Sequence, residues 1–258
     1  MTVSASPSAR NQLALITGSG ASSIDSMRRI EPITLDTPHG PHSPGLAQVE
    51  WHGRQLLHLP RHGAEHNLAP HLVNYRANLW ALQHLGVSRV LALGAVGGIR
   101  EDLIAPGSLV VPDQLIDYTW GRDSSFFDGA TGELQHIDFT LPFTAGLRKV
   151  LLAAAQANEQ SCVNGGVYGV TQGPRLETAA EIERLQRDGC DLVGMTAMPE
   201  AVLARELGIE YGFLAVVVNA AAGRGSVPIT DEFEQQMARA VGGALKLLSV
   251  AVGELLPD

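Results

Sequence analysis

Residues 13–20 read LALITGSG, a run of uncharged and largely apolar residues that stops at Gly18-Ser19-Gly20. Such a run predicts a short buried strand, and the two glycines predict a tight turn at its end. A turn of this composition leaves backbone amides and the Ser19 hydroxyl free to donate to an anion, although taken alone it is an ordinary turn more often than a binding loop. The motif is not GxGxxG, because residue 23 is serine, and no Walker lysine follows. Dinucleotide-binding and P-loop motifs are therefore excluded.

Apolar runs of this kind recur along the chain, separated by segments with apolar residues at helical spacing. One of these segments opens with Thr178-Ala-Ala-Glu181, a capping-box pattern. Strands that alternate with helices predict an α/β fold, in which helices flank a mixed and largely parallel sheet. The expected strands are 13–17, 55–59, 90–95, 108–111, 166–171, 192–195 and 213–218, and the expected helices are 74–85, 142–157, 178–187, 199–207 and 230–256.

The composition of the chain limits its function classes. It has 258 residues, of which 45% are hydrophobic and 17% charged, which excludes a disordered protein and favours a single domain over residues 1–258. The Ser-rich residues 1–11 are expected to be flexible and do not resemble a secretory signal. A net charge of −9 argues against nucleic-acid and anionic-membrane partners. Two cysteines without CxxC spacing favour reduced thiols and a cytoplasmic location.

Glycines and a few polar residues collect at the ends of the expected strands, where α/β proteins bind their ligands. Arg61 and His62 offer a bidentate fork for an oxyanion and a second hydrogen-bonding group. His62, His66 and His71 lack an HExxH pattern, so no metal site is expected. The other strand-end segments are 94–98 (GAVGG), 172–178 (QGPRLET), 193–200 (VGMTAMPE) and 218–221 (VNAA).

Taken in order, these motifs resemble the trimeric purine nucleoside phosphorylase family, and particularly its methylthioadenosine phosphorylase branch. The resemblance covers nearly the whole chain and includes residues 73–80 (VNYRANLW). It implies attack of phosphate on the anomeric carbon of a nucleoside, with inorganic phosphate as co-substrate and no other cofactor. A phosphate beneath the sugar both stabilises the cationic transition state and supplies the nucleophile. The residues implied to hold phosphate are Ser19, Arg61, His62, the Ala95 amide and Thr196.

The resemblance also implies a sugar site and an assembly. Met195 corresponds to a residue that packs against the sugar, and His136 to one that a neighbouring subunit contributes near the 5′ end, so a homotrimer is expected. Gly94 stands in the phosphate site where relatives carry Thr or Asn. Without the donor that Thr or Asn would supply, either phosphate binding is weaker or a water takes the place of that donor.

Departures from the adenine-specific branch indicate the base. That branch has aspartates where this chain has Asn219 and Ala221, and Ser where it has Glu177. An asparagine amide donates to a 6-oxo group and accepts from N7–H, while a carboxylate accepts the N1 proton that a 6-oxopurine carries. A buried polar mismatch costs several kcal/mol, so these residues predict a 6-oxopurine. The alternative for Glu177 is an exposed residue in a helix first turn.

An absent histidine indicates the 5′ group. Inosine and guanosine phosphorylases bind the 5′-hydroxyl with a histidine near the start of the C-terminal helix, whereas all nine histidines here lie at or before residue 136. The corresponding stretch offers Val227, Ile229 and Phe233, in a register that the loop length leaves open. The combined prediction is phosphorolysis of S-methyl-5′-thioinosine. The alternatives are an inosine/guanosine phosphorylase, a methylthioadenosine phosphorylase, a hydrolytic nucleosidase and a nonenzymatic nucleoside sensor.

Overall fold

Strands and helices alternate along the chain, close to the positions that the sequence predicts. The computed structural model describes residues 12–22, 24–130 and 132–257, without the side chains of residues 230–235. The expectation for residues 1–11 therefore lies outside the described residues. The strands are β1 (Gln12–Thr17), β2 (Met27–Pro32), β3 (Ala47–Trp51), β4 (Arg54–Pro60), β5 (Val87–Gly98), β6 (Leu109–Val111), β7 (Gln114–Asp117), β8 (Cys162–Asn164), β9 (Val167–Val170), β10 (Leu192–Gly194) and β11 (Glu210–Ala220). The helices are α1 (Tyr75–His84), α2 (Ala145–Ala157), α3 (Ala179–Arg187), α4 (Ala197–Glu206) and α5 (Ile229–Leu255), with short 3-10 helices η1 (Pro70–Leu72) and η2 (Glu101–Leu103).

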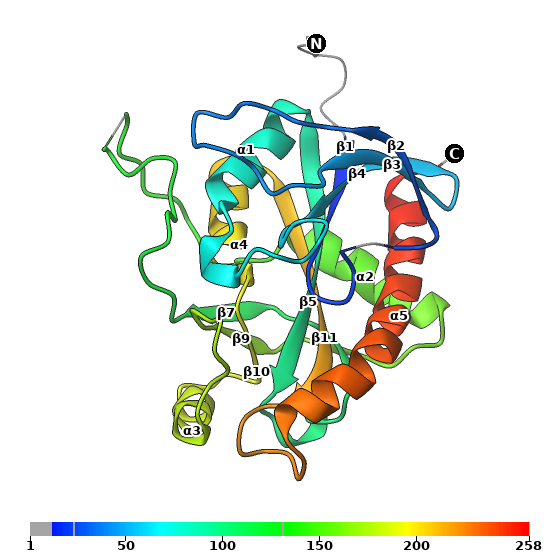
Figure 1. Cartoon of the computed structure of the whole chain (residues 1–258), viewed down its shortest axis with the longest axis vertical. Helices are drawn as coiled ribbons and strands as arrows, with labels where there is room; N and C mark the ends of the chain where they lie inside the picture. The colour runs from blue at the N-terminus through cyan, green and yellow to red at the C-terminus, as the bar shows by residue number, and fades with distance from the viewer. Residues whose placement is uncertain (1–11, 23, 131, 258) are drawn as a thin grey trace.

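The strands form one 11-stranded sheet in the order β2-β3-β4-β1-β5-β10-β9-β7, to which β11, β6 and β8 are joined through β5. β1 pairs in parallel with β4 and β5, and β5 pairs in parallel with β11. Antiparallel pairs join β2 to β3, β3 to β4, β5 to β10 and β6 to β11. The predicted mixed and largely parallel sheet is confirmed, with β5 and β11 running through its centre (Figure 1).

Helices cover both faces of the central strands. α1 and α4 pack on one face, and α2 and α5 pack on the other (Figure 1). Because successive side chains of a strand point to opposite faces, a strand between two helical layers is apolar at every position. β11 follows this rule, since Phe213, Ala215 and Val217 belong to the first core and Leu214, Val216 and Val218 to the second.

Four strands and two helix starts differ from the predictions; α4 begins at Ala197 and not at Pro199. β2, β3, β7 and β8 were not predicted; β2, for example, is largely exposed and carries no apolar alternation. α2 begins at Ala145 with Thr144 as its N-cap, so Pro142 precedes the helix instead of opening it. The capping box of α3 is confirmed, because Thr178 and Glu181 exchange backbone-to-side-chain hydrogen bonds. Among the described helices, none is long and apolar enough to span a membrane.

Candidate active site

The carboxyl ends of β1 and β4 bring the first candidates together. Thr17 pairs with Pro60 in parallel register, so the 18–20 turn and Arg61 follow at the same edge of the sheet. The Arg61 amide donates to the Thr17 carbonyl at 2.9 Å. A hydrogen bond thus joins the two segments that the sequence marks as anion-binding candidates.

Arg61 is fully buried and is held by a carboxylate. Its Nε and Nη2 donate to the two Glu200 oxygens at 2.9 Å, and Nη1 donates to the Leu93 carbonyl at 2.7 Å. Burial lowers the pKa of Arg61, but the Glu200 charge outweighs this effect and holds the pKa above its ordinary value. A Cβ on Gly18 would lie 2.7 Å from Arg61 Nη1, so only glycine at position 18 leaves room for the guanidinium. Arg61 therefore lies directly behind the 18–20 turn.

His62 is buried beside Arg61 and is neutral. Its Nδ1 lies 2.8 Å from the Leu68 carbonyl oxygen. Because a carbonyl oxygen only accepts hydrogen bonds, Nδ1 carries the proton and donates it. Burial, followed by the Arg61 charge, lowers the pKa of His62 to about 4. At neutral pH its Nε2 is then a hydrogen-bond acceptor, suited to a phosphate oxygen that carries a proton.

A second histidine, His66, lies beside these groups. In the sequence it is notable only for lacking a zinc-binding HExxH pattern. The ring of His66 meets that of His62 edge-on, with centroids 4.8 Å apart. Its Nε2 lies 3.3 Å from the Ser19 hydroxyl, and its Nδ1 lies 3.3 Å from the Ser22 hydroxyl. His66 thus ties the 18–22 turn to the segment after β4.

Gly94 lies on β5 with its open side directed at an aromatic ring. A Cβ there would lie 2.4 Å from Cζ of Phe213, a fully buried residue of β11. The ring therefore takes the space that a side chain at position 94 would need, and the structure explains why this chain has no donor there. Ala95, the next residue, is half-buried against the opposite core.

Thr196 and Met195 stand where β10 leads into α4. Thr196 is the N-cap residue of α4 and is 7% exposed, but its side chain makes no capping hydrogen bond. The Met195 side chain covers Gly173, where a Cβ would lie 2.5 Å from its sulfur. The candidates for phosphate and sugar therefore adjoin the 172–175 turn.

A small cavity of about 70 Å³ unites the candidates for the base. Glu177 is half-buried, and its Oε1 accepts a hydrogen bond from the Thr171 hydroxyl at 2.6 Å. Asn219 is buried after a register shift in β11, and its Nδ2 donates to the Ala220 carbonyl at 2.7 Å. The lining residues are Gly97, Leu176, Glu177, Val193, Gly194, Met195, Asn219, Ala221, Ala222 and Ile229.

The candidates for the 5′ group are only partly brought to this cavity. Ile229, the first residue of α5, lines it. Val227 is 52% exposed and is not a lining residue. Phe233 lies among the residues whose side chains are outside the described structure. His136 is exposed and does not line the cavity within its own chain.

Arg122 is a site residue that the sequence did not suggest, because it lies in the polar, glycine-rich stretch 121–133, which carries no motif. Its Nη1 donates to the Met195 and Met198 carbonyls at 2.9 and 2.6 Å, and its Nη2 donates to the Thr171 and Gln172 carbonyls at 3.3 and 2.8 Å. One guanidinium thus ties together the two segments that carry the sugar and base candidates. Only the fold shows this convergence, since carbonyls leave no pattern in a sequence.

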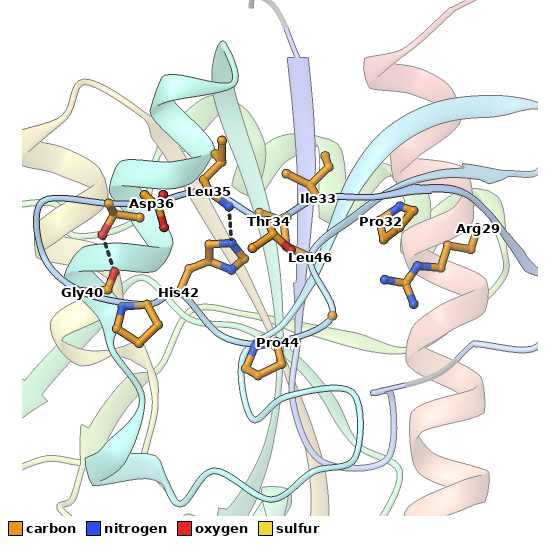
Figure 2. Close-up of a pocket in the computed structure, with 13 residues that line it drawn as sticks. Arg29, Pro32, Ile33, Thr34, Leu35, Asp36, Gly40, His42, Pro44 and Leu46 are labelled. Atoms are coloured by element: carbon orange, nitrogen blue, oxygen red, sulfur yellow. Dashed lines mark hydrogen bonds between the residues drawn. The ribbon is translucent and has the colours of Figure 1, made fainter. Parts of the chain in front are cut away.

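A second cavity of about 490 Å³ lies away from these residues, between segments 29–37 and 40–46 (Figure 2). His42 is one of the residues that line it. Its Nε2 accepts a hydrogen bond from the Leu35 amide at 3.1 Å, and its Nδ1 lies 2.9 Å from the Ser43 carbonyl. Both ring nitrogens are therefore engaged. None of the candidates whose side chains the structure describes lines this cavity.

The chain matches the family model of the phosphorylase superfamily over residues 12–252. It is 52% identical over 213 residues to a Xanthomonas campestris protein named probable S-methyl-5′-thioinosine phosphorylase, covering 83% of this chain and 85% of the relative. A Moorella thermoacetica protein named probable 6-oxopurine nucleoside phosphorylase is 42% identical over 221 residues, covering 86% and 84% of the two chains.

A solved structure also resembles this fold. The methylthioadenosine phosphorylase of Schistosoma mansoni, in complex with tubercidin, superposes with a TM-score of 0.86 at 31% sequence identity. The superposition covers 94% of this chain and 90% of the other.

Proposed function

This chain belongs to the phosphorylase superfamily, and we propose that it cleaves S-methyl-5′-thioinosine with inorganic phosphate to hypoxanthine and 5-methylthioribose 1-phosphate. The observation that carries the proposal is the cavity in which Glu177, Asn219 and Met195 meet. The name of the Xanthomonas campestris relative supports the same substrate.

Two side chains in the cavity suit a 6-oxopurine. Glu177 keeps an oxygen for the N1 proton while its Oε1 accepts from Thr171. Asn219 has one N–H on the Ala220 carbonyl, which leaves its second N–H and its oxygen for O6 and N7–H. An aspartate at position 219 would only accept hydrogen bonds and would offer no donor to O6, whereas the amide offers one.

The reaction needs the phosphate charge close to the sugar and phosphate and sugar held in position. It does not need a covalent enzyme intermediate. As the bond between the anomeric carbon and the purine nitrogen breaks, its electron pair passes to the base, and N7 takes up a proton that comes, overall, from the hydrogen phosphate. A phosphate oxygen then bonds to the anomeric carbon, and the phosphate charge stabilises the cationic sugar until it does. Ser19, Arg61, His62, the Ala95 amide and Thr196 hold the phosphate in this proposal, and Met195 packs on the sugar.

Ile229 provides an apolar wall near the base, which suits a methylthio group better than a hydroxyl. Glu177 lines both the cavity of about 70 Å³ and a neighbouring cavity of about 410 Å³, so the space beside it is not limited to the smaller one. Ile229 and Leu176 border the smaller cavity from the first residue of α5 and from the segment before α3.

The working enzyme is proposed to be a homotrimer in the cytoplasm, with no cofactor besides phosphate. The exposure of His136 within its own chain supports a role in which each copy delivers this residue to the 5′ end of its neighbour's site. Sedimentation gives the number of subunits, and His136→Ala should raise KM for the nucleoside without changing that number.

One assay tests the proposed function. Base release is measured with and without phosphate on methylthioinosine, inosine and methylthioadenosine. We expect release only with phosphate and the highest kcat/KM for methylthioinosine. A kcat/KM for inosine that equals or exceeds it would indicate a general 6-oxopurine phosphorylase, a second candidate favoured by the name of the Moorella thermoacetica relative. Preference for methylthioadenosine would overturn the assignment of the base.

A further inference from the structure

Tyr168 carries a buried hydroxyl that the described fold leaves without a partner. The residue lies on β9 and is fully buried, and its hydroxyl makes no hydrogen bond to any residue that the structure describes. An unsatisfied buried hydroxyl costs about 1–3 kcal/mol of stability, whereas phenylalanine in the same place would cost nothing of the kind. The hydroxyl therefore calls for a functional explanation.

The surroundings of Tyr168 place this hydroxyl at the entrance to α4. Its ring packs against Phe213, with centroids 5.2 Å apart. Its oxygen lies 2.3 Å from where a Cβ on Gly194 would stand, so the missing side chain of Gly194 makes room for it. Gly194 precedes Thr196 by two residues. Burial raises the pKa of Tyr168, and the nearby Thr196 amide and hydroxyl oppose that rise.

Thr196 is the complementary group. An N-cap threonine ordinarily accepts a hydrogen bond from an amide in the first turn of its helix. The Thr196 hydroxyl does not do so, although the residue is only 7% exposed. Tyr168 and Thr196, both buried, thus lie on either side of Gly194 and Met195 at the point where the proposed phosphate site begins.

We propose that Tyr168 is a positioning residue for phosphate: when phosphate binds, its hydroxyl donates to Thr196 Oγ1 and thereby directs the Thr196 proton at a phosphate oxygen. A hydroxyl has one proton, so when its oxygen accepts from Tyr168 the proton is left for the anion. The inference rests on the proposed function, because it takes Thr196 as a phosphate ligand. Gly94 contributes no side chain to this site, and Phe213, which fills its place, packs against the Tyr168 ring.

Tyr168→Phe tests the proposal, because it removes only the hydroxyl oxygen. We expect the Kd of inorganic phosphate, measured by calorimetry without nucleoside, and the KM for phosphate to rise about 3- to 10-fold. The KM for the nucleoside should stay the same, and Tm should stay the same or rise. A merely structural tyrosine would lower Tm and leave phosphate affinity unchanged.

Tyr118→Phe is the matched control. It also removes one hydroxyl, which donates to Asp188 at 2.7 Å, away from Thr196. It should leave the Kd of phosphate unchanged.

A double-mutant cycle with Thr196→Ala then identifies the partner. In the Thr196→Ala protein, Tyr168→Phe should have no further effect on phosphate affinity. The proposal is wrong if Tyr168→Phe changes that affinity less than twofold, or if its full effect persists without the threonine hydroxyl. If the wild-type protein binds phosphate but releases no base, the proposed function fails while the cycle still tests Tyr168. If it binds no phosphate, both fail.

Discussion

Arg61 and Glu200 form a bidentate ion pair in which both side chains are buried, with exposed fractions of 0% and 1%. The Tyr211 hydroxyl donates to the Glu200 oxygen that also receives Nη2, at 2.7 Å. A buried pair of this kind contributes little net stability, but the loss of one partner leaves an uncompensated charge. The pair thus fixes the one buried cation of the proposed phosphate site among the described residues.

Glu200→Gln should therefore lower the free energy of unfolding by about 3–5 kcal/mol, because Arg61 keeps its charge and loses its partner. Urea denaturation measures the change. Glu50→Gln is the control, since Glu50 pairs with Arg28 at the surface, where the exposed fractions are 35% and 67%. That control should change stability by less than ~1 kcal/mol. Equal effects of the two variants would contradict the role given to Glu200.

The contact between Gly94 and Phe213 predicts a specific steric penalty. Gly94→Ala places a Cβ 2.4 Å from the Phe213 ring, which is fully buried. We expect an overpacking cost of about 1–3 kcal/mol. The cost should fall in a Phe213→Leu background, where the smaller side chain frees space. Calorimetric Tm values of the four proteins give the coupling, and additive effects would show that the ring is not the obstacle.

The sequence predicted those parts of the fold that depend on local patterns. The capping box at Thr178 and the apolar runs of β1, β5 and β11 needed only neighbouring residues. Arg61 was identified as a candidate, but Glu200 lies 139 positions away, and pairing over such a separation leaves no local signal. Gly94 was identified as a lost donor, but its cause, Phe213, becomes visible only through the pairing of β5 with β11. Arg122 binds carbonyls, which every residue has.

Two buried histidines predict a loss of stability in weak acid. Burial lowers the pKa of His58 and of His62 from 6.5 to about 4. Between these values the unfolded chain binds protons that the folded protein does not, so stability rises with pH through this window and is lost as the pH falls through it. Urea denaturation between pH 7.5 and 4.5 measures the slope.

His58→Gln removes one of the two groups and keeps a polar side chain beside the Thr17 hydroxyl, which lies 2.8 Å from His58 Nε2. The variant should show a shallower pH dependence than the wild-type protein. If stability depends on pH equally in the variant and the wild-type protein, the lowered pKa of His58 does not contribute to the acid sensitivity.

The choice of base predicts the outcome of one substitution in the cavity. Asn219→Asp replaces an amide that donates and accepts with a carboxylate that only accepts, so it loses the donor for O6 and gains a partner for a 6-amino group. We expect kcat/KM for methylthioinosine to fall at least ~10-fold, and the ratio of methylthioadenosine to methylthioinosine activity to rise about 100-fold. Asn219→Ala is the control, because it removes the side-chain groups for both bases and should lower both activities without favouring the adenine nucleoside. If the Asp and Ala variants show the same ratio, the amide does not read the 6-position, and Glu177 alone must account for the preference.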